Sequence, residues 1–111
     1  MNKDKDKERA EPPQPQPVQL SGVRYEALPW GKARGLGQNG GLLAAFDAAS
    51  GKELWTLKVY DVHYNAAIEG DKQERFIESI TADGPHHLLV QAERGAGRYR
   101  VDARDRSVTR L

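Results

Sequence analysis

The sequence predicts an all-β fold: a single small antiparallel meander sheet or sandwich of about six or seven short strands, with a disordered N-terminal tail. Two observations point to this fold. Turn-forming residues recur about every 8 to 15 positions, and the runs between them are rich in β-branched and aromatic side chains. Strands joined by hairpins have this spacing, whereas strands that alternate with helices need longer intervals.

The expected strands lie between these turn signals. Alternation is clearest where Trp55, Leu57 and Val59 point to one face of a strand and Thr56 and Lys58 to the other. Such a strand has one buried face and one solvated face. The full set of expected strands spans residues 23–28, 42–47, 53–62, 74–82, 87–93, 98–103 and 107–110.

Residues 42–49 also suit a helix, because leucine and alanine favour helix by intrinsic propensity. Glycines bound this segment on both sides, and a helix of only eight residues is marginal. We therefore favour a strand here, with a short helix as the alternative.

Residues 1–17 are expected to form a disordered, charged and proline-rich tail, and residues 18–111 a single β domain. The tail balances four basic against four acidic residues and has no apolar side chain larger than alanine beyond Met1, so it has little to bury. It contains no apolar signal region, and no apolar run in the chain is long enough to cross a bilayer. We therefore expect a cytoplasmic protein without a membrane partner.

Residues 45–55 predict a β-hairpin, which is the most specific structural feature of the sequence. Asp47 is placed to accept hydrogen bonds from the backbone N–H groups of the turn, and Gly51 can adopt the positive φ that the turn requires. Trp55 then returns on the second strand, on its buried face. We take Asp47, Gly51 and Trp55 as the structural anchor of the domain.

This segment resembles the tryptophan-docking motif of the PQQ-type β-propeller repeat, Ala-x-Asp-x-x-Thr-Gly-x-x-x-Trp. Ala45, Asp47, Gly51 and Trp55 match the motif, and Ser50 stands where threonine is usual. The resemblance implies a structural tryptophan that packs between neighbouring sheets.

A weak echo of this hairpin occurs 55 residues later, in residues 101–108, which keep the apolar-Asp-Ala start but lack the glycine and the tryptophan. A chain of 111 residues holds at most two propeller blades, whereas closed propellers typically have four to eight. The resemblance therefore implies neither a closed propeller nor a quinone cofactor.

The loop from Gly31 to Gly41 contains a literal Gly-x-Gly-x-x-Gly pattern at Gly35, Gly37 and Gly40. A dinucleotide site needs these glycines at the start of a helix within a βαβ unit, and the sequence predicts no such helix. We expect a mobile basic surface loop that binds no nucleotide.

No other pattern indicates catalysis, a cofactor or a metal. The chain has no cysteine, and its three histidines are His63, His86 and His87. Asp61 and His63 would share one strand face, but two ligands leave a transition metal incompletely coordinated. No serine stands in a recognisable nucleophile motif. The sequence therefore predicts a protein that is not an enzyme.

The possible interaction surface consists of basic residues. Residues 93–111 hold six arginines and three acidic residues, a net charge of +3, which is small for a nucleic-acid footprint and makes nucleic acid a disfavoured partner. The leading hypothesis is a protein–protein interaction module with an unknown protein partner. The alternative is a small-ligand or nucleic-acid binder that uses the Gly31–Gly41 loop and the C-terminal arginines. The residues assigned to this surface are Arg98, Arg100, Arg104, Lys32 and Arg34.

Overall fold

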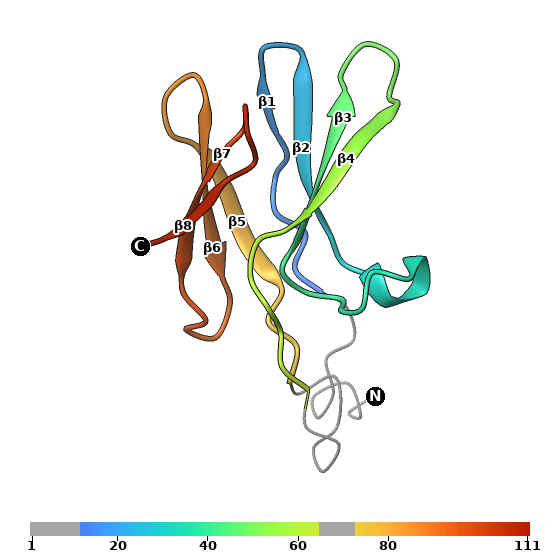
Figure 1. Cartoon of the computed structure of the whole chain (residues 1–111), viewed down its shortest axis with the longest axis vertical. Coiled ribbons are helices and arrows are strands. Elements are labelled where there is room, and N and C mark those ends of the chain that lie inside the picture. The colour runs from blue at the N-terminus through green and yellow to red at the C-terminus, as the bar shows by residue number, and fades with distance from the viewer. Residues whose placement is uncertain (1–11, 65–72) are drawn as a thin grey trace, which may run out of the picture.

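The structure, a computed structural model, describes residues 12–64 and 73–111 and contains two four-stranded sheets (Figure 1). Every pair of neighbouring strands is antiparallel. In chain order, the first sheet holds β1 (Val18–Leu20), β2 (Val23–Leu28), β3 (Leu42–Asp47) and β4 (Glu53–Lys58), and the second holds β5 (Ile77–Ala82), β6 (His87–Ala92), β7 (Arg98–Asp102) and β8 (Val108–Arg110). The predicted all-β fold is confirmed.

The strand predicted at residues 42–47 is confirmed as β3, and the helical alternative is wrong. Leu43 and Ala45 lie in the core, while Leu42 and Ala44 are buried as well. Because β3 lies between β2 and β4 and is covered on both faces, burial outweighs the helix propensity of its leucines and alanines.

Three strands differ from expectation by more than one residue. The strand predicted over residues 53–62 ends at Lys58, and the strand predicted from residue 74 begins at Ile77. The short strand β1 was not predicted; it pairs with β2 through a turn in which both Ser21 and Gly22 have positive φ. Residues 31–34, within the predicted glycine loop, form a 3₁₀ helix.

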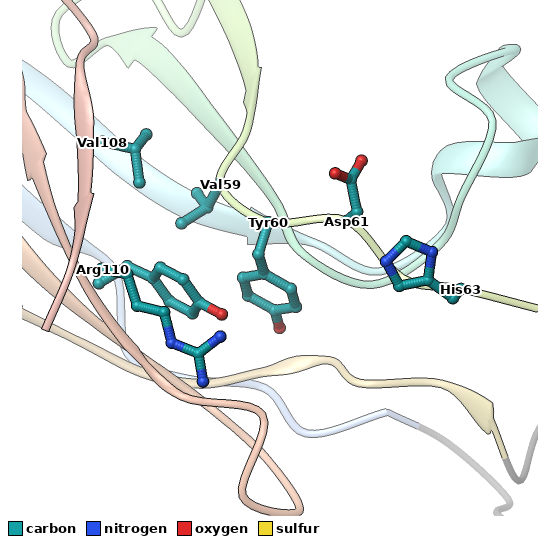
Figure 2. A pocket seen from close by; sticks show the side chains of 7 residues that line it. Val59, Tyr60, Asp61, His63, Val108 and Arg110 are labelled. Carbon is teal, nitrogen blue, oxygen red and sulfur yellow. The ribbon is translucent and has the colours of Figure 1, made fainter.

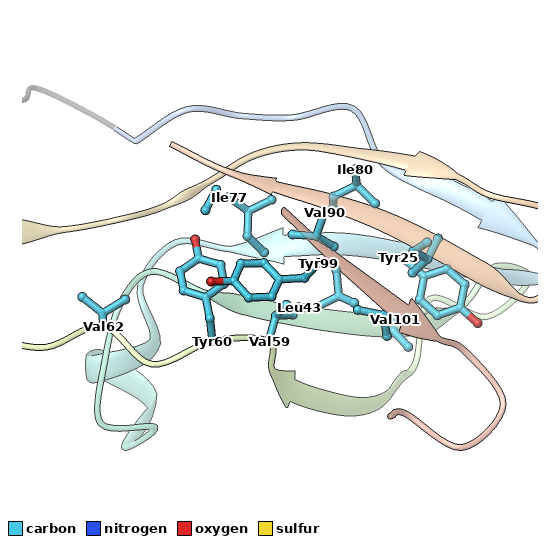
Figure 3. Close-up of a cluster of buried hydrophobic side chains, with 13 residues drawn as sticks. Tyr25, Leu43, Val59, Tyr60, Val62, Ile77, Ile80, Val90, Tyr99 and Val101 are labelled. Atoms are coloured by element: carbon cyan, nitrogen blue, oxygen red, sulfur yellow. The ribbon is translucent and has the colours of Figure 1, made fainter. Parts of the chain in front are cut away.

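One apolar core joins the two sheets (Figure 3). The apolar sides of both sheets contribute to it, and so does the segment that follows β4, residues 59–62, which leaves the first sheet and packs against the second. Its members are Tyr25, Leu43, Ala45, Val59, Tyr60, Val62, Ile77, Ile80, Leu88, Val90, Ala92, Tyr99 and Val101.

The β3–β4 hairpin has the predicted turn. The Asp47 carboxylate accepts hydrogen bonds from the N–H groups of Ala49 (2.8 Å) and Ser50 (3.1 Å), and Gly51 has a φ of 79°. Trp55 packs against the core but is only half-buried. Its ring lies 5.9 Å from that of Tyr25.

The β7–β8 hairpin repeats the main hydrogen bonds of this turn. The Asp102 carboxylate accepts a hydrogen bond from the Arg104 N–H at 2.8 Å, just as the Asp47 carboxylate accepts one from the Ala49 N–H. Arg106 takes the place of the turn glycine, with a φ of 65°, and its N–H donates to the Asp102 carbonyl at 2.7 Å. The echo in residues 101–108 is therefore a true structural equivalence, although a left-handed arginine costs more than a glycine.

The two equivalent hairpins turn opposite faces toward the core. The core residues Leu43 and Ala45 have Arg98 and Arg100 as their counterparts 55 residues later, and both arginines are exposed. The second sheet instead buries the alternate face, on which Val101 is fully enclosed. Its outer face is therefore charged and solvated.

The predicted tail is only partly within the described residues, because residues 1–11 lie outside them. Residues 12–17 lie beside the end of β2, where Pro12 is buried. Pro13, Gln14, Pro15 and Pro17 line a hollow of about 230 Å³ together with Glu26, Ala27 and Pro29. Within the described residues, no helix is both long and apolar enough to cross a membrane.

Candidate functional site

The glycine loop is pinned to the fold by one buried side chain, Gln38, which is 5% exposed. Its amide nitrogen donates to the carbonyls of Gly40 and Tyr60, both at 2.8 Å, and its amide oxygen accepts from the Val62 N–H at 3.2 Å. The expected mobility of the loop therefore stays a prediction, but the structure anchors the loop at Gln38. Gln38 ties the loop to the segment that crosses between the sheets.

A buried carboxylate supports the same loop from the other side. Glu74 accepts hydrogen bonds from the Gly40 N–H (3.3 Å), the Asn39 amide (3.2 Å) and the Tyr64 hydroxyl (3.0 Å). A phosphate would need such N–H groups for itself and would meet the negative charge of Glu74. This arrangement suits packing and is unfavourable for a nucleotide.

Of the three glycines in the Gly-x-Gly-x-x-Gly pattern, only Gly40 is required by close packing. A Cβ atom at Gly40 would lie 2.5 Å from the carbonyl oxygen of Arg75, so only glycine fits there. Gly35 and Gly37 face open space with positive φ and are needed for backbone conformation alone.

The structure divides the five predicted interaction residues between the two sheets. Lys32 and Arg34 lie on the 3₁₀ helix beside the first sheet. The Arg34 guanidinium pairs with Glu53 at 2.7 Å, and the Lys32 ammonium sits 3.8 Å from the centroid of the Tyr64 ring. Both cations therefore already have local partners.

The other three interaction residues lie on or next to β7. Arg100 pairs with Asp83 at 2.9 Å and Arg104 with Asp102 at 3.0 Å. Hydrogen bonds from Arg104 hold the pKa of the Asp102 carboxyl well below its usual range. Within residues 12–64 and 73–111, Arg98 forms no ion pair. The five residues do not form one continuous basic surface.

A hollow of about 400 Å³ opens between β8 and the segment that follows β4 (Figure 2). Tyr60 and Tyr99 stack within it, with ring centroids 5.0 Å apart and planes inclined by 17°. Burial raises the pKa of the Tyr60 phenol, so its hydroxyl remains protonated and donates to the Arg75 carbonyl. The lining residues are Val59, Tyr60, Asp61, His63, Tyr99, Val108 and Arg110.

The charged groups around this hollow differ in their pairing. The Asp61 carboxylate contacts the Lys58 ammonium at 2.6 Å, and this hydrogen bond lowers its pKa. Arg110 lies over the Tyr99 ring, 5.7 Å from its centroid, and has no acidic partner among the described residues. Asp61 and His63, the pair considered as metal ligands, both line the hollow. Among the described residues no third such ligand joins them.

Beside this hollow, half of the backbone polar groups of β8 have no partner among the described residues. Leu111 donates to the Arg98 carbonyl, and the Ser107 carbonyl accepts from Asp102, so the odd-numbered positions of β8 bond to β7. In an antiparallel ladder the intervening residues direct their N–H and C=O groups away from the neighbour. Those residues are Val108 and Arg110, which also line the hollow.

The other sheet edges are less available. The edge strands β1 and β5 lie next to each other, where the two sheets meet (Figure 1). The edge strand β4 contains a bulge near Leu54 and ends in Lys58, and both features discourage pairing with another strand. β8 is short and ends in Arg110, but it pairs with β7 in an unbroken register and contains no bulge.

The sequence did not reveal this site, because its two sides come from residues 59–63 and 108–110, which lie far apart in the chain. Only the strand order shows that β8 is an edge strand. Compared with models of protein families and with curated proteins, the sequence finds no match in either.

Proposed function

We propose that this domain is a non-catalytic protein-binding module that captures an extended segment of another protein at the free edge of β8. The observation that carries the proposal is the coincidence of two features at Val108 and Arg110. Their N–H and C=O groups face away from β7, and their side chains line the hollow beside Tyr60 and Tyr99. An added strand would gain main-chain hydrogen bonds, and the hollow would receive its side chains.

The alternative, a small-ligand or nucleic-acid binder, has less support. In the Gly31–Gly41 loop, the Gly40 N–H is already bonded to the carboxylate of Glu74. Of the C-terminal arginines, Arg100 and Arg104 are paired with aspartates. The cytoplasmic location and the local resemblance of residues 45–55 to a propeller repeat remain predictions.

Selection of peptides from a random displayed library, followed by amide hydrogen exchange, tests the proposal. A selected peptide should slow exchange at the amides of Val108 and Arg110. The amide of Thr109 is bonded to β7 already and should change little, which makes it the internal control. Selected peptides that protect other residues and leave β8 unchanged would contradict edge capture. Binding to a single-stranded oligonucleotide that weakens steeply with salt would favour the alternative.

A further inference from the structure

We propose that the segment captured at β8 is acidic, with carboxylates at alternate positions that flank one apolar residue on the same face of the strand. This inference rests on the proposed function and names the chemistry of its partner. It arises from the row of side chains that β8 and its turn present along the open side of the structure.

That row consists of Arg106, Val108 and Arg110. Val108 and Arg110 are alternate residues of β8 and share one face, whereas Arg106 lies in the turn before β8 and joins the row through its contact with the first sheet. The Arg106 guanidinium lies 5.4 Å from the Trp55 ring centroid on the first sheet, Val108 packs against the core, and Arg110 lies over Tyr99. The two arginines therefore stand on either side of one apolar contact.

Both arginines are held in place without being neutralised. Within the part of the chain that the structure describes, neither forms an ion pair, whereas Arg100 and Arg104 of the same region do. Stacking on an aromatic ring orients a guanidinium and leaves its N–H donors available for a carboxylate. The nearby Asp61 is occupied by Lys58. The open edge thus has an excess of positive charge.

An added strand would place its own alternate side chains beside this row. Cross-strand neighbours lie about 5 Å apart, so carboxylates opposite Arg106 and Arg110 and an aliphatic side chain opposite Val108 would complement it. The complementary pattern is acidic-x-apolar-x-acidic. A phosphodiester backbone would supply negative charge, but it has no N–H groups for the free carbonyls of β8.

Binding of three matched peptides to the full chain tests the inference. Their central residues are Glu-Thr-Val-Thr-Glu, Gln-Thr-Val-Thr-Gln and Lys-Thr-Val-Thr-Lys, with blocked ends, and affinity is measured at low and high salt. We expect the glutamate peptide to bind about tenfold more tightly than the glutamine peptide at low salt, with the advantage shrinking at high salt. The lysine peptide should bind most weakly.

Variants of the protein show whether the preference for glutamate comes from this row or from the net charge of the protein. Arg110→Gln should remove most of the preference for glutamate over glutamine while leaving the affinity for the glutamine peptide nearly unchanged. Arg106→Gln should act in the same direction, and its urea midpoint shows whether the turn still folds. Lys52→Gln makes the same charge change on the exposed β3–β4 turn and should leave the preference intact.

The outcomes distinguish the two proposals. If the glutamate and glutamine peptides bind equally and both protect the Val108 and Arg110 amides, the acidic partner is refuted and edge capture stands. If the preference survives Arg110→Gln and Arg106→Gln, the row is not its source and the inference is wrong. If no peptide of any charge protects β8, edge capture itself fails, and the inference fails with it.

Discussion

Replacing Gln38 tests whether one buried amide holds the glycine loop and the crossing segment together. Gln38→Met keeps the length and approximate volume of the side chain but removes three hydrogen bonds, to the carbonyls of Gly40 and Tyr60 and from the N–H of Val62. Each bond is worth roughly 0.5–1.5 kcal/mol net, and a buried group left without a partner costs roughly 1–3 kcal/mol. We therefore expect the free energy of unfolding to fall by about 3–5 kcal/mol.

Urea unfolding followed by tryptophan fluorescence measures this loss. A domain of this size has a total stability of roughly 5–10 kcal/mol, so the variant should be close to unfolding at 37 °C. Gln19→Met is the matched control, because Gln19 is exposed on β1 and its replacement should stay within about 0.5 kcal/mol. A loss below about 1 kcal/mol for Gln38→Met, with an unchanged dependence on urea, would refute the role given to these bonds.

Three further predictions concern other parts of the chain. Trp55→Ala should cost about 2–3 kcal/mol, less than a fully buried tryptophan because Trp55 is half-buried, whereas Trp30→Ala should cost under about 1 kcal/mol since Trp30 is 53% exposed; equal urea midpoints would contradict this difference. Asp102 has a lowered pKa in the folded state, so its contribution is present above about pH 4 and is lost as the pH falls through the folded value. Asp102→Asn should therefore flatten the decline of stability between about pH 5 and pH 2, and an unaltered slope would count against it. A chain that begins at residue 18 should melt roughly 4–8 °C below one that begins at residue 12, because about 1 kcal/mol of packing around Pro12 is lost; identical melting curves would mean that residues 12–17 do not stabilise the domain.

The hairpins were predictable because their information is local. The turn of β3–β4 is specified by Asp47 and Gly51, which bond within a few residues of each other. The same chemistry at Asp102 builds the second hairpin, even though Arg106 replaces the glycine. The alternation of Trp55, Leu57 and Val59 likewise indicated which side of β4 meets the core.

The anchoring of the glycine loop could not be predicted because its partners are distant in sequence. Gln38 bonds to residues 22 and 24 positions later, and Glu74 reaches the loop from 34 positions away. Composition showed five glycines and two cations and so indicated mobility. No local sequence pattern predicts that a polar side chain will be buried and will form its hydrogen bonds with a distant segment.

The sequence by itself determined that this chain is built from short antiparallel strands. It also determined the position of the β3–β4 turn and the inward side of Trp55, because side-chain alternation and turn chemistry act over a few residues. The tertiary structure alone decided that the strands divide into two sheets, that residues 59–62 cross from one sheet to the other, and that β8 keeps a free edge beside a hollow. Strand order depends on which apolar faces meet across long stretches of chain. Such contacts are set by the packing of the whole core, which no short segment encodes.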